Sequence, residues 1–164
     1  MAEQVPEVAV VMGSASDATV MSQAVELLAE FDLDAEVRVL SAHRLPHEML
    51  AWGAAARARG TKVIIAGAGG AAHLPGMLAA ATTLPVIGVP VSATKLAGVD
   101  ALLSIVQMPK GVPVATVAVD GARNAGLLAV EILSLASPQL ADALDEHKRR
   151  LRDDALGQDD QLRG

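Results

Sequence analysis

The feature that most constrains the fold is a long stretch, from Val63 to Thr94, that contains no Asp, Glu, Lys or Arg. By its length alone this stretch could span a bilayer. Glycines and prolines nevertheless divide it into pieces that are too short to cross, namely Gly67, Gly69, Gly70, Pro75, Pro85 and Pro90. Strands buried on both faces of a parallel sheet are also continuous apolar runs. We therefore expect the centre of a parallel sheet here, and no membrane partner.

Short apolar runs alternate with segments of helical spacing along the whole chain. The runs predict strands at residues 8–12, 35–40, 62–66, 85–89 and 114–119. The other segments predict helices at residues 18–31, 46–60, 74–81, 97–104, 122–135 and about 138–152. This alternation indicates a parallel sheet with helices on both faces. We predict an α/β fold, a three-layer α/β/α sandwich around a flavodoxin-like five-stranded parallel sheet of order 2-1-3-4-5, with C-terminal helices.

Length and composition limit the organisation and the partners. We expect a single domain at residues 1–153, which includes the C-terminal helix, and a flexible tail at 154–164. The net charge of −6 and the near absence of aromatic residues disfavour nucleic acid as a partner. The absence of cysteine excludes disulfides and thiol catalysis. The first residues lack the basic end and apolar stretch of a signal peptide, so we expect a cytoplasmic protein.

Three loops rich in small and polar residues each join a predicted strand to a helix. They are Gly13-Ser14-Ala15-Ser16-Asp17, Ser41-Ala42-His43-Arg44 and Gly67-Ala68-Gly69-Gly70-Ala71-Ala72-His73. Small residues let backbone N–H groups approach an anion, and helix N-termini favour negative charge. Asp17 is expected to cap its helix or to accept from ligand hydroxyls. In the predicted strand order these loops surround the ligand crevice, which indicates a site for a phosphorylated metabolite.

The second loop carries the strongest chemical signal, a histidine beside an arginine. Arg44 offers a planar fork that suits phosphate, with charge-assisted bonds of about 1.5–3 kcal/mol each. Histidine as a residue type changes its charge near neutral pH and is the usual proton shuttle in enzymes, which makes His43 a candidate for that role. Standing alone, the pair would be equally consistent with a solvated surface loop. Its place among the other two loops favours catalysis with phosphate binding.

Two other interpretations of these motifs are open at this point. His43, His47 and His73 could form a three-histidine zinc site, although Pro46 argues against a shared helical face and no HExxH pattern is present. The third loop also imitates the dinucleotide fingerprint G-x-G-x-x-A. However, the acidic residue expected about 20 positions later is absent, and the motif lies in the third βα unit. We therefore interpret it as a phosphate or substrate loop.

Together, several motifs resemble one family, the N5-carboxyaminoimidazole ribonucleotide mutases of purine biosynthesis. They are GSASD, SAHR, AGAGGAAHLPGM, GVPV and SIVQMPKGVPVATVAV, and the resemblance covers about residues 7–135. It implies an isomerase that interconverts N5-carboxyaminoimidazole ribonucleotide and 4-carboxy-5-aminoimidazole ribonucleotide without a metal or an organic cofactor. It also implies a homo-oligomer, an octamer with active sites at subunit junctions.

The resemblance assigns roles to individual residues. His43 would be the general acid/base, Arg44 would bind the phosphate and Asp17 would face the ribose. The other substrate-binding residues that it implies are Ser14, Ser41, Gly70 and His73. The chain departs from the usual family pattern at Leu45-Pro46-His47, where a threonine and an acidic residue are common, and at Lys110, where arginine is common.

Two alternative functions would share the fold. One is a direct aminoimidazole ribonucleotide carboxylase that uses CO2, although the AGGAAHLPG loop looks like the mutase branch. The other is an FMN-type nucleotide-binding module. The chain has no tyrosine, and Trp52 lies within a predicted helix, so neither residue type is placed to stack on a flavin.

Overall fold

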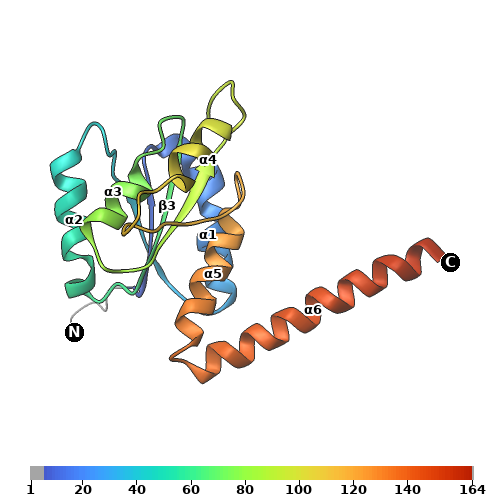
Figure 1. The fold of residues 1–164 in the computed structure, drawn as a ribbon. Helices are drawn as coiled ribbons and strands as arrows, with labels where there is room; N and C mark the ends of the chain where they lie inside the picture. The colour runs from blue at the N-terminus through green and yellow to red at the C-terminus, as the bar shows by residue number, and fades with distance from the viewer. Residues whose placement is uncertain (1–5, 164) are drawn as a thin grey trace. The chain divides into compact units, whose positions relative to one another are not determined.

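Five parallel strands form one sheet in the order β2-β1-β3-β4-β5, which confirms the predicted topology (Figure 1). The computed structural model describes residues 6–163, with side chains through residue 158. The strands are β1 (Val8–Met12), β2 (Ala35–Val39), β3 (Val63–Gly69), β4 (Val86–Val91) and β5 (Ala115–Thr116). Gly67 of β3 pairs with Met12 of β1 on one side and with Val89 of β4 on the other. The chain order reverses between β1 and β3, so a crevice is expected at their carboxyl ends.

Helices cover both faces of this sheet. The helices of the chain are the short 3-10 helix η1 (Ala15–Asp17), α1 (Ala18–Glu30), α2 (Pro46–Arg59), α3 (Leu74–Ala81), α4 (Val99–Val106), α5 (Ala122–Ser134) and, in the second unit described below, α6 (Pro138–Arg163). On one face, α2, α3 and α4 pack on the sheet through buried residues such as Met49, Leu78 and Ile105. On the other face, Met21 of α1 lies directly over Gly67. These two helical layers enclose the sheet as the predicted three-layer sandwich.

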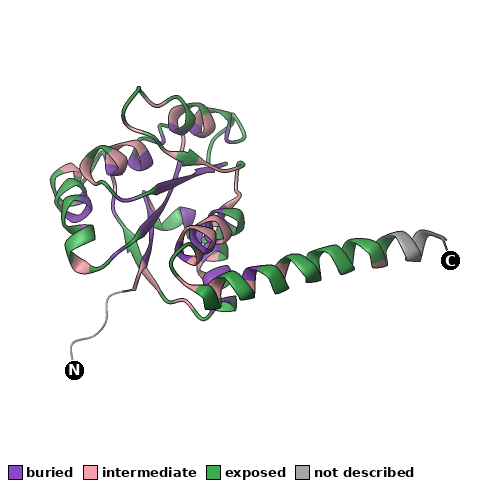
Figure 2. Cartoon of the chain, turned by 60° about the horizontal axis from the view of Figure 1, so that its bottom comes forward, coloured by how far each residue is buried: buried purple, intermediate pink, exposed green. Residues whose placement is uncertain are grey.

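The three inner strands form the buried centre, shown in purple in Figure 2. Every residue of β1 and β4 is buried, as the continuous apolar runs predicted. At Gly67 any larger residue would collide with the sulfur of Met21, which is fully buried. The small residues of β3 therefore allow α1 to lie close to the sheet.

Four strands differ in length from the prediction, β2 and β4 by one residue each and β3 and β5 by more. β3 continues to Gly69, beyond the predicted end at Ala66, because Gly69 still pairs with Val91 of β4. Backbone ladder bonds do not depend on the side chain, so the glycines extend the strand. The fifth strand is only two residues long, although its extension stays tied to β4 through bonds from the N–H of Val117 and of Asp120.

The last helix is longer than predicted. The sequence prediction ended it near Arg152 and left residues 154–164 as a frayed tail, but α6 continues to Arg163; Gly164 lies outside the described residues. Ala155 and Leu156 favour helix, and one isolated glycine, Gly157, costs only about 1 kcal/mol without ending it.

The chain divides into two compact units, one up to Ala129 that holds the sheet and one from Val130 onward that holds the end of α5 and all of α6. The single domain at residues 1–153 stays a prediction. Within the described part of the chain, no helix is both long enough and apolar enough to cross a bilayer.

Candidate functional site

A cleft of about 370 Å³ opens at the carboxyl ends of β1 and β3, where the strand order predicted it. All three predicted loops contribute to its walls. The lining residues are Gly13, Ser14, Ser16, Asp17, Ser41, Ala42, His43, Arg44, Ala68, Gly69, Ala71, Leu74 and Ala93. Parallel pairing aligns the strand ends, which is why segments distant in sequence meet here.

The first loop is shaped by a reciprocal capping box. The Ser14 hydroxyl accepts from the N–H of Ser16 at 3.3 Å, and Asp17 Oδ2 accepts from the N–H of Ser14 at 3.2 Å. This corrects the expected cap, because the Asp17 side chain makes no capping bond to α1 and instead closes the turn before it. The box fixes the direction in which Ser14 and Asp17 face the cleft.

Asp17 is a buried carboxyl at the edge of an open cleft, with only 5% of its surface exposed. Burial raises the pKa of Asp17, since it disfavours the charged form, while the Ser14 N–H and the Ser16 hydroxyl partly offset the rise. Shifted carboxyl pKa values of this kind are common at functional sites.

The second loop is held to the first by Arg44. The Ser41 hydroxyl accepts from the Arg44 backbone N–H at 3.3 Å and from its Nε–H at 3.1 Å, and the Gly13 carbonyl accepts from Nη2 at 3.3 Å. These side-chain bonds use two of the five guanidinium N–H donors. Arg44 lines the cleft, so its remaining donors are available to bind an anion there.

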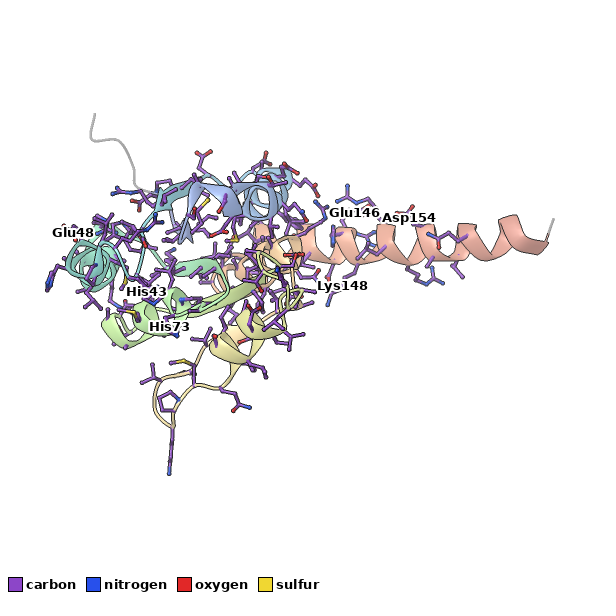
Figure 3. All side chains as sticks on the ribbon, turned by 90° about the horizontal axis from the view of Figure 1, so that it is seen from above. His43, Glu48, His73, Glu146, Lys148 and Asp154 are labelled. Atoms are coloured by element: carbon purple, nitrogen blue, oxygen red, sulfur yellow. The ribbon has the colours of Figure 1, made fainter. Side chains whose placement is uncertain are left out.

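The second and third loops meet through two histidines, which Figure 3 labels. His43 Nε2 and His73 Nδ1 are 2.7 Å apart, and the two rings stand edge to face at 88° with centroids 4.8 Å apart. In a neutral pair one nitrogen must donate and the other accept. Both side chains are exposed, so a ligand has access to the pair.

The structure brings together most of the residues that the sequence singled out. Gly70 and His73, which were expected to line the same pocket, lie just outside the cleft lining. Gly70 follows Gly69 at φ +63°, and His73 reaches the site through His43. Within residues 6–158, the structure forms no cluster of three or more His, Cys, Asp or Glu side chains that could hold a metal ion.

Sequence reasoning missed Ala93 as a wall of the cleft. Ala93 follows the end of β4 by two residues and packs against Gly69, where an added Cβ would lie 2.5 Å from the Ala93 Cβ. The available signal was its position, since β4 ends at the same edge of the sheet as β1 and β3. An alanine carries no chemical signal of its own.

Known proteins resemble this chain over most of its length. The family model described as AIR carboxylase matches residues 7–154. The N5-carboxyaminoimidazole ribonucleotide mutase of Mycobacterium tuberculosis is 60% identical over 157 residues, which cover 96% of this chain and 90% of the relative. The protein of that same name from Aquifex aeolicus is 61% identical over 140 residues, covering 85% and 84%. The crystal structure of Treponema denticola PurE superposes with a TM-score of 0.87 at 26% identity and covers 96% of this chain and 98% of that one.

Proposed function

The chain belongs to the AIR carboxylase family, and we propose that it is the isomerase that converts N5-carboxyaminoimidazole ribonucleotide to 4-carboxy-5-aminoimidazole ribonucleotide in purine biosynthesis. One observation supports this assignment above the others. An arginine fork, a buried carboxyl and an exposed histidine line one cleft, and they are Arg44, Asp17 and His43. These are the groups that a phosphate, a ribose and a proton transfer require.

The reaction moves a carboxylate from the exocyclic nitrogen N5 to the ring carbon C4 of the same aminoimidazole. In the first half, the bond between N5 and the carboxyl carbon breaks, its electron pair returns to N5, and protonated His43 supplies a proton there. In the second half, C4 attacks the released CO2, and neutral His43 removes the C4 proton. His43 ends in the protonation state in which it began, so one residue completes the cycle.

The same bound ring must serve both halves, which explains the binding residues. We assign the phosphate to Arg44 and the ribose hydroxyls to Asp17, with Ser14 and Ser41 beside them. Gly70 and His73 complete the predicted set from the third loop. Holding the substrate by its phosphate and its ribose keeps N5 and C4 within reach of the His43 side chain, so that orientation supplies much of the rate enhancement.

The apolar part of the lining suits the released CO2. Ala68, Ala71, Leu74 and Ala93 line the same cleft as His43. Such side chains offer no strong hydrogen-bond partner that would hold water beside the CO2, which favours recapture of a neutral gas over its hydration.

A substrate comparison tests the function directly. The protein is incubated with N5-carboxyaminoimidazole ribonucleotide, and separately with aminoimidazole ribonucleotide plus bicarbonate, and the C4-carboxylated product is measured. We expect product at a much higher rate from the first substrate. Faster product from the second would instead identify a direct carboxylase, and no product from either would refute the enzyme assignment.

We further propose that the enzyme works in the cytoplasm as a homo-octamer, as the resemblance to the mutase family implies. Apolar side chains on and just before α4 provide surface for contact between copies. They are Leu96, Val99, Leu103 and Val106, and about half or more of each is exposed. Light scattering measures the assembly mass, and a monomeric mass at working concentration would contradict the octamer.

A further inference from the structure

The wall that carries Ala93 is anchored from another part of the chain. Asp120, which follows β5, accepts two hydrogen bonds from Ser92. The Ser92 N–H donates to Oδ1 at 2.9 Å, and the Ser92 hydroxyl donates to Oδ2 at 2.5 Å. Asp120 is itself fixed, since its own N–H donates to the Pro90 carbonyl at 2.8 Å. The carboxylate therefore joins the chain after β5 to the first residue beyond β4.

This anchor lies one residue from the cleft. Ala93 lines the cleft, and its N–H donates to the Val91 carbonyl at 2.9 Å. Its Cβ rests against Gly69, so that no side chain would fit at that position of β3. Any movement of Ser92 is therefore expected to move the apolar wall that Ala93 contributes to the cleft.

Both segments that meet through the Ser92–Asp120 hydrogen bonds contain residues with positive φ. Asp120 has φ +56°, a left-handed conformation that costs energy for most residues and less for Asp, Asn and Gly. The segment that follows Ala93 also turns through positive φ, at Ala97 (+49°) and Gly98 (+86°). Within that segment, Thr94 donates to Asp100 at 2.6 Å. The carboxylates of Asp120 and Asp100 thus each accept hydrogen bonds from this short loop, at Ser92 and at Thr94.

We propose that Asp120 is a positioning residue that holds Ala93 in place as one wall of the cleft and so slows the escape of CO2 between the two halves of the reaction. This inference rests on the proposed isomerase function. Asp120 does not line the cleft, so it acts through Ser92 and Ala93. If the wall opens while CO2 is free, the gas leaves and dissolved CO2 replaces it before C4 attacks.

Three variants separate the hydrogen bonds from the backbone strain. Asp120→Asn keeps an acceptor for the Ser92 N–H, offers an amide to its hydroxyl and tolerates positive φ. Asp120→Gly also tolerates positive φ but loses both bonds. Ser92→Ala removes only the hydroxyl bond. The matched control is Asp32→Gly, because Asp32 has the same φ of +56° and lies outside the cleft lining.

The readout is the origin of the carboxyl carbon in the product. The substrate carries a ¹³C carboxylate, the buffer holds unlabelled bicarbonate with carbonic anhydrase, and mass spectrometry measures how much C4-carboxylated product has lost the label. A purely structural role would lower stability or rate without changing this fraction. Thermal unfolding of each variant shows whether it is folded.

We expect Asp120→Gly to raise label loss about tenfold over the native enzyme, because two hydrogen bonds no longer oppose opening of the wall. Ser92→Ala should raise it less, and Asp120→Asn and Asp32→Gly should match the native enzyme. If folded Asp120→Gly loses no more label than the native enzyme, the inference about Asp120 is overturned. The proposed function still stands in that case, provided that the native enzyme forms product. Absence of product from the native enzyme would refute the function itself.

Discussion

Replacing Arg44 by alanine should weaken binding of the ribonucleotide through its phosphate and leave the fold intact. The side chain is exposed, and it donates to the Ser41 hydroxyl of its own loop and to the Gly13 carbonyl of the first loop. Truncating such a surface residue changes the free energy of unfolding by about 0.5 kcal/mol or less. The effect on stability is therefore too small to mask an effect on binding.

The loss of binding energy follows from the donors that Arg44 has left. With Nε–H and one Nη2–H engaged, a phosphate can still be held by two charge-assisted bonds. At the weak end of their range, about 1.5 kcal/mol each, these bonds contribute about 3 kcal/mol in a cleft open to water. The dissociation constant should then rise about 100-fold. The dissociation constant of Arg44→Lys should lie between those of the native protein and Arg44→Ala, because lysine keeps the positive charge but lacks the planar guanidinium fork.

A thermodynamic cycle of two proteins and two ligands, measured by calorimetric titration, isolates the interaction energy between Arg44 and the phosphate. The native protein and Arg44→Ala are each titrated with 4-carboxy-5-aminoimidazole ribonucleotide and with the matching nucleoside, which lacks the phosphate. Arg38→Ala, which removes a charged side chain outside the cleft, is the control. We expect a coupling energy near 3 kcal/mol between Arg44 and the phosphate. A coupling below about 0.5 kcal/mol, the level seen for sites that do not interact, would refute the assignment.

Three further predictions concern the cleft and the core beneath it. His43→Asn should lower turnover about 10²–10⁴-fold with substrate still bound, whereas His73→Asn should lower it about tenfold or less because the His43 ring remains. Steady-state kinetics compares the two, and equal losses would contradict the role of His43. Because burial raises the pKa of Asp17, its ionised form destabilises the folded state, and native stability falls as the pH rises from the ordinary value of 3.8 through the raised one. Asp17→Asn should therefore gain free energy of unfolding relative to the native protein across that window and keep the gain at pH 7; denaturation at several pH values measures this, and a pH-independent difference would count against it. Gly67→Ala should cost about 1–3 kcal/mol in urea unfolding, because the new methyl group meets the buried sulfur of Met21, and an unchanged midpoint would show that Met21 can move aside.

The sequence alone determined the order of the elements and the edge of the sheet where the site lies. Apolar runs and helical spacing are local patterns, which is why β1 and α3 agree with prediction to the residue. The three loops were recognisable from their small and polar residues. Parallel order then required that they meet at one edge.

The tertiary structure decided what each of those residues touches. Asp17 closes a turn with Ser14 instead of capping α1, His73 contacts His43, and Ala93 forms a wall. The short β5 and the long α6 likewise depend on neighbours and on accumulated helix preference more than on any local stop signal. Periodicity along a chain specifies which face a residue occupies. Periodicity does not specify which residue of a distant segment contacts a given side chain, because that contact depends on strand register and on how closely the distant segments pack.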